Sequence, residues 1–127
     1  MQRDDLIERT IRQLADALAR AMNFRKQHDL VAALAEVEAA LASVAGADPR
    51  LLDSLDPALL AGQLDPVRVA AIGQLLAARA VLELESGDRA RAERTRTRAV
   101  AYLREADARG ALDADGRGRL DALQGDG

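Results

Sequence analysis

Three closely spaced Asp-Pro dipeptides constrain the fold of this chain more than any other feature of its sequence. They lie in the segment ADPRLLDSLDPALLAGQLDPVR, at Asp48-Pro49, Asp56-Pro57 and Asp65-Pro66. An Asp carboxylate accepts the free amide hydrogens of a first helical turn. Pro suits the next position because its missing N–H costs nothing there and its φ angle is already helical. Each dipeptide therefore predicts a helix start: short helices over 49–55 and 57–62, and a long helix over 66–86.

Apolar residues on both sides of this segment recur every three or four positions, which is the spacing of one buried helix face. Upstream, the pattern predicts a helix over residues 4–27 and a second helix that follows the N-cap Asp29. Downstream, the long helix ends at Gly87, and Asp88 caps another helix of similar length. The sequence therefore predicts an all-α fold in which a connector of one or two short helices joins two antiparallel helical hairpins.

The chain has 127 residues, which is enough for one hydrophobic core but not for two. We expect a single helical domain over residues 1–110. A Gly- and Asp-rich tail follows over 111–127, and we expect it to be flexible, with at most a short helix around 120–123. In such a tail, Asp126→Ala should change stability less than the loss of a helix cap does.

The predicted core is poor in large side chains. Ala and Leu supply most of the apolar content, and Phe24 and Tyr102 are the only aromatic residues. Such a core buries little apolar surface area per residue. The connector adds many leucines, whose side chains must be shielded from water. We therefore expect self-association, most simply as a homodimer.

Residues that would carry chemistry are scarce. The chain contains no cysteine and a single histidine, His28, which falls at the predicted turn of the first hairpin. It contains neither a Gly-rich phosphate loop nor a nucleophile-elbow motif. We therefore expect a protein that is not an enzyme and that uses no cofactor or metal.

The net charge and the hydropathy of the chain indicate which classes of partner to expect. The net charge of −3 gives no general attraction to nucleic acid, so nucleic-acid binding is not expected. The start, MQRDDLIERTIRQ, lacks the apolar run of a secretory signal. No stretch approaches the roughly 20 apolar residues that span a bilayer. We expect a cytoplasmic location, no contact with membranes, and another protein as the partner.

An internal repeat relates the two hairpins, because Asp29 and Asp88 are 59 positions apart and the same offset pairs several alanines. Each hairpin resembles a tetratricopeptide (TPR) repeat. The residues that carry the resemblance are Ala21, Phe24, His28-Asp29, Ala33, Val37, Ala40 and Leu41 in the first hairpin, and Leu76, Ala80, Gly87-Asp88, Ala92, Ala99 and Val100 in the second. The chain departs from the repeat at His28, where Gly is preferred, and at Arg96, where a large apolar residue is expected. The resemblance implies a TPR-like fold that binds a protein segment.

The chain up to about Gly110 also resembles an uncharacterised bacterial family of small helical proteins, a domain of unknown function. The segments that carry this resemblance are MQRDDLIERTIRQLADAL, FRKQHDLVAALAEVEAAL, LLDSLDPALL and the turn SGD. The resemblance implies a bacterial, helical protein. It implies no activity and no catalytic residues.

Arginines are the candidate site residues. Arg20 and Arg79 are equivalent under the 59-residue offset and lie on the first helix of each hairpin, which forms the concave face in TPR-like folds. Arg96, on the last long helix, falls near Arg79 if the second hairpin is antiparallel. Our hypothesis is that Arg20, Arg79 and Arg96 line a groove that binds a carboxylate of a partner protein.

Three alternatives to this hypothesis stay open. The groove could instead sense a small anion or nucleotide, the tail's own Asp113, Asp115 or Asp121 could occupy it, or all three arginines could point into solvent. The neighbouring Arg91, Arg94 and Arg98 are expected to be solvated. If the hypothesis holds, the double variant Arg79→Ala/Arg96→Ala should weaken partner capture and leave stability nearly unchanged.

Overall fold

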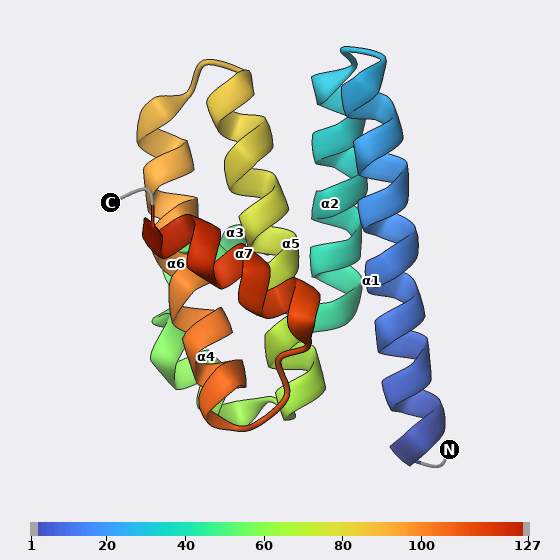
Figure 1. Ribbon diagram of the computed structural model, residues 1–127, viewed down its shortest axis with the longest axis vertical. Coiled ribbons are helices and arrows are strands. Elements are labelled where there is room, and N and C mark those ends of the chain that lie inside the picture. Colours follow the sequence, from blue (N-terminus) through green and yellow to red (C-terminus); the bar gives the residue numbers. More distant parts are fainter. Residues whose placement is uncertain (1–2, 126–127) are drawn as a thin grey trace.

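The computed structural model describes residues 3–125 and contains only helices over that range (Figure 1). The elements are α1 (Arg3–Lys26), α2 (Leu30–Ala45), α3 (Pro49–Ser54), α4 (Pro57–Gln63), α5 (Pro66–Glu85), α6 (Arg89–Ala108) and α7 (Ala114–Gly125). The all-α prediction is confirmed. The described residues do not include 1–2, at the start of the predicted domain, or Asp126 and residue 127, at the end of the predicted tail.

All three Asp-Pro dipeptides begin helices, as predicted. Asp48 accepts a hydrogen bond from the amide of Arg50 at 2.9 Å, and Asp65 accepts one from that of Arg68 at 3.1 Å. The Asp56 carboxylate caps α4 in the same way. The connector between the hairpins is therefore folded into α3 and α4.

The long helices form two antiparallel pairs, α1 with α2 and α5 with α6, whose tight turns lie at the same end of the molecule (Figure 1). In the first turn the amide of Asp29 donates to the carbonyl of Phe24 at 2.9 Å, after His28 at φ 60°. In the second turn Asp88 donates to Glu83 at 3.0 Å, after Gly87 at φ 92°. The 59-residue repeat thus holds for backbone geometry, with His28 in the left-handed conformation that Gly adopts more easily.

Helix α5 is the centre of the fold because it packs against α1, α2, α6 and α7. It approaches α6 closely at Gly73, where a Cβ atom would lie 2.8 Å from the Leu103 side chain. The alanine-rich composition and this glycine let the second hairpin pack tightly. The core accordingly runs along α5.

The C-terminal segment differs from the sequence prediction. Instead of a flexible tail, the structure has the twelve-residue helix α7, which crosses α5 and α6 (Figure 1). Leu112 and Leu120 are buried, and the Asp113 carboxylate accepts a hydrogen bond from the amide of Gly116 at 2.7 Å. Helix propensity is low in this segment, so its stability comes from burial of these leucines against the hairpin.

Candidate partner-binding groove

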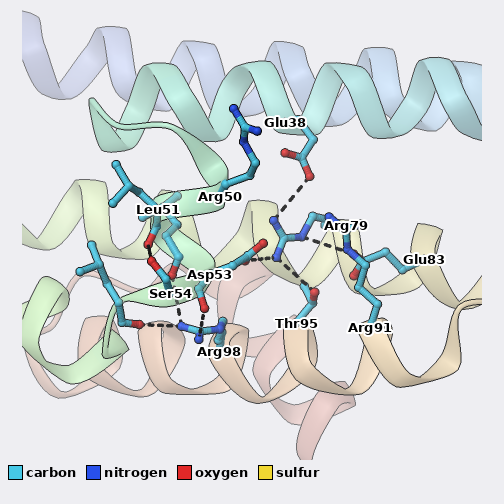
Figure 2. A network of polar contacts seen from close by, with 12 residues as sticks. Glu38, Arg50, Leu51, Asp53, Ser54, Arg79, Glu83, Arg91, Thr95 and Arg98 are labelled. Atoms are coloured by element: carbon cyan, nitrogen blue, oxygen red, sulfur yellow. Dashed lines mark hydrogen bonds and ion pairs between the residues drawn. The ribbon is translucent and has the colours of Figure 1, made fainter.

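Arg79 lies at the centre of a buried polar cluster between the hairpins and the connector (Figure 2). Its side chain is only 1 % exposed. The Nη2 atom donates to Asp53 Oδ1 of α3 at 2.6 Å and to Thr95 Oγ1 of α6 at 3.2 Å. The Nη1 atom donates to Glu38 Oε1 of α2 at 3.5 Å. Arg79 therefore links α5 to three other helices and is closed to a partner.

Glu83, one turn further along α5, completes this Arg79 cluster. Its Oε2 atom lies 3.7 Å from Arg79 Nε and 2.8 Å from Arg91 Nε, and the residue is buried. A buried charge is tolerated when it is paired and hydrogen-bonded. Glu83 is paired with two arginines, but neither of its oxygens accepts a hydrogen bond in the described part of the chain, so its burial depends on these ion pairs.

Two other arginines bind the ends of the connector helices. Arg98 and Arg109 donate to carbonyl groups in or directly after the last turns of α3 and α4. The accepting residues are Leu52, Asp53 and Leu55 for Arg98, and Ala61 and Leu64 for Arg109. The final carbonyls of a helix have no partner within that helix, so these guanidinium groups stabilise both short helices. The expectation that Arg98 is merely solvated is wrong for this reason.

Arg20 and Arg79 make equivalent contacts within their hairpins. Arg20 Nε donates to Glu36 Oε2 at 2.8 Å, and Glu36 and Thr95 are themselves 59 positions apart. The Arg20–Glu36 pair is largely exposed, whereas the Arg79–Thr95 pair is buried. The hydrogen bond with Glu36 raises the pKa of Arg20 above its ordinary value. The same repeat position is therefore a surface ion pair in one hairpin and a core group in the other.

Arg96 faces α7. Its Nε atom donates to the carbonyl oxygen of Leu123 at 2.9 Å, and Glu93 Oε2 lies 3.7 Å from its Nη1 atom. Arg96 thus anchors the C-terminal helix. The structure gives Arg20, Arg79 and Arg96 three separate sets of partners and does not bring them together in one groove. Within residues 3–125, none of the three arginines pairs with Asp113, Asp115 or Asp121.

A different groove lies between the two hairpins, beside α7. It has a volume of about 300 Å³ and is lined by α1, α5 and α7. The lining is mainly apolar: Leu18, Ala21 and Met22 from α1, Ala77, Ala78, Val81 and Leu82 from α5, and Ala122 and Leu123 from α7. Met22 and Val81 remain 47 % and 41 % exposed. We refer to this site as the α1–α5–α7 groove.

Two arginines line the same groove, and their pairing differs. Arg25 bridges α1 to α5, because its Nε atom donates to Glu85 Oε1 at 2.8 Å. This hydrogen bond raises the pKa of Arg25 above its ordinary value, against a smaller opposing effect of burial. Arg119 on α7 makes no ion pair with any carboxylate of residues 3–125. The rim of the groove thus presents one neutralised and one uncompensated guanidinium group.

The sequence contained a signal for this groove that the search for arginines missed. Met22 and Val81 are 59 positions apart, so the repeat places an apolar side chain at the same exposed position of both hairpins. Exposed apolar residues that gather on one face mark interaction sites more often than scattered ones do. The contribution of α7 has no such signal in the sequence, because α7 lies outside the two repeated hairpins.

No group of three or more His, Asp or Glu side chains within residues 3–125 is placed to hold a metal ion. No helix in that range is long and apolar enough to cross a bilayer. Comparisons of the chain with protein families, with curated proteins and with solved structures found no match.

Proposed function

We propose that this protein is a non-catalytic, TPR-like interaction module that binds a segment of a partner protein in the α1–α5–α7 groove. The TPR-like interpretation rests on the repeat itself. The two turns share the same backbone hydrogen bond, and the contacts of Arg20 and Arg79 recur at equivalent positions.

The observation that carries the proposal is the apolar groove between the first helices of the two hairpins. Its floor exposes Met22 and Val81, and apolar side chains of a partner would displace water from them. A protein segment can supply several such side chains in a row, which fits a groove about 300 Å³ in volume with two helical walls.

Sensing of a small anion through the predicted arginines has less support. Arg79 is buried among carboxylates, Arg20 pairs with Glu36, and Arg96 binds a backbone carbonyl. An anion would have to displace these partners before it could bind.

Selection of short peptides from a display library tests the proposal. Wild-type protein should enrich peptides that bind at least about tenfold more weakly to Val81→Asn, because the polar side chain removes apolar contact area. Val31→Asn is the matched control, since Val31 is 81 % exposed on α2 and does not line the groove. Circular dichroism checks that both variants keep their helices.

Two results would overturn the proposal. The first is a selection that enriches no peptide, or that enriches only peptides that bind the Val81→Asn variant as tightly as they bind the wild-type protein. The other is a dimer in sedimentation equilibrium that Val81→Asn converts to a monomer, which would make a second copy of this chain the occupant of the groove.

A further inference from the structure

We infer that the segment bound in the α1–α5–α7 groove is an amphipathic helix with an acidic edge, whose carboxylate pairs with Arg119. This inference rests on the proposed function and names the chemistry of the partner. It follows from the lining of the groove and from the charges on its rim.

The lining favours a helix over an extended segment. Apart from Arg25, Arg119 and the weakly accepting Met22 sulfur, the lining side chains contain no hydrogen-bonding group. An extended segment would bury backbone N–H and C=O groups against apolar walls without partners. A helix satisfies these groups internally and presents apolar side chains along one face, as helices bound in grooves do. The α1 wall runs from Leu18 to Arg25, which is two helical turns, and matches a face of that length.

The rim charges favour an acidic partner. The positive charge of Arg25 is compensated by Glu85, whose carboxylate accepts its hydrogen bond. On α7, Arg117 lies 3.5 Å from the Asp107 carboxylate, whereas Arg119 has no ion-pair partner among residues 3–125. The groove therefore carries an uncompensated positive charge at its α7 edge, and a carboxylate placed there gains a charge-assisted hydrogen bond.

The position of Arg119 is fixed by its neighbours in α7. Leu120 is buried, and Leu123 accepts a hydrogen bond from Arg96 through its backbone carbonyl. These contacts hold α7 against the second hairpin within the turn that follows Arg119. The backbone at Arg119 is thus held beside the apolar groove, so the acidic edge of a bound helix should face α7.

A charge-swap selection tests the inference. The probe is a display library of helix-forming peptides with a leucine stripe, in which each polar position encodes Glu and Lys in equal proportion. Wild-type protein should enrich Glu over Lys on one edge of the stripe. Arg119→Glu should reverse the preference to Lys, whereas the matched control Arg117→Glu should keep the wild-type preference for Glu.

Affinity measurements complete the test. Replacing the selected Glu by Gln in the best peptide should weaken binding to wild type about fivefold, as expected for a partly exposed ion pair. The same replacement should have no effect on binding to Arg119→Gln, which isolates the pairwise interaction.

The possible failures are distinguishable. Peptides that depend on Val81 but show no Glu preference, or whose preference survives Arg119→Glu, overturn the inference and leave the proposed function standing. Groove-dependent peptides that bind equally well after a central Pro substitution overturn the helical partner. A selection that yields no peptide dependent on Val81 overturns both proposals.

Discussion

The Arg79 cluster and the α1–α5–α7 groove both place arginine side chains against α5, yet these arginines differ in burial and in ion pairing. Arg79 is 1 % exposed and bonds to Asp53, Thr95 and Glu38. Arg119 lines an open apolar groove and has no carboxylate partner among residues 3–125. One guanidinium group holds helices together, and the other is available to a ligand.

The role of an arginine in a helical hairpin therefore depends on the groups that the neighbouring helices place beside it. Arg20 and Arg79 occupy the same repeat position, but only Arg79 is covered, by the connector helix α3 and by α2. A buried charge without partners is costly, so Arg79 and its carboxylates must be retained together. An exposed pair such as Arg20–Glu36 is under no such constraint.

The largest expected effect is that of Arg79→Ala. It leaves a cavity and several carboxylates without their cation, and we expect a loss of about 3–5 kcal/mol in the free energy of unfolding. Arg20→Ala, the equivalent position in the first hairpin, should cost at most about 1 kcal/mol. Urea denaturation of the two variants measures both values. This expectation replaces the one from the sequence, in which Arg79→Ala/Arg96→Ala leaves stability nearly unchanged, and equal midpoints would remove the distinction between the two arginines.

The next effect concerns the wall of the groove. Leu120→Ala removes the buried side chain that holds α7, and we expect a loss of about 2–3 kcal/mol, together with faster hydrogen exchange of the α7 amides. Leu59→Ala is the control, because Leu59 is 61 % exposed and should change stability by no more than about 0.5 kcal/mol. If the α7 amide hydrogens exchange at the same rate in Leu120→Ala and Leu59→Ala, then Leu120 does not hold α7 in place as a wall of the groove.

The smallest effect at neutral pH is expected for Tyr102→Phe. The Tyr102 hydroxyl is buried without a hydrogen-bond partner in the described part of the chain, and unlike Glu83 and Arg79 it has no ion pair either. Removing it should leave stability unchanged or raise it by up to about 1 kcal/mol. Urea denaturation near pH 7 provides the measurement, and a clear loss of stability would reveal a bonded hydroxyl.

The same tyrosine should give the protein an alkaline pH dependence. Burial raises the pKa of Tyr102 above its ordinary value, and the positive charge of Arg98 only partly opposes this. Above about pH 10 the unfolded chain loses the phenolic proton while the folded chain keeps it, so stability falls as the pH rises. Tyr102→Phe should lack this decline. Tyr102 is the only tyrosine, so phenolate absorbance of the native protein follows its titration directly, and an ordinary midpoint would contradict the burial effect.

Much of the fold could be predicted because its signals are local. The predicted starts at Pro49, Pro57 and Pro66 are helix starts in the structure, since capping depends on a residue and the first turn that follows it. The turn before Asp88 was equally readable from its glycine. The helix α7 was not predictable in this way, because its stability depends on Leu112 and Leu120 reaching a surface formed by distant residues.

For the candidate site, the 59-residue offset shows which positions are equivalent, including Met22 with Val81 and Arg20 with Arg79. The packing of the helices then buries Arg79, and it leaves Arg119 beside an apolar groove. Helical periodicity assigns a residue to a face of its own helix, whereas exposure and ion pairing depend on which other helix covers that face. That covering is set by the packing of α3 and α7, whose contacts are made across long separations in the chain.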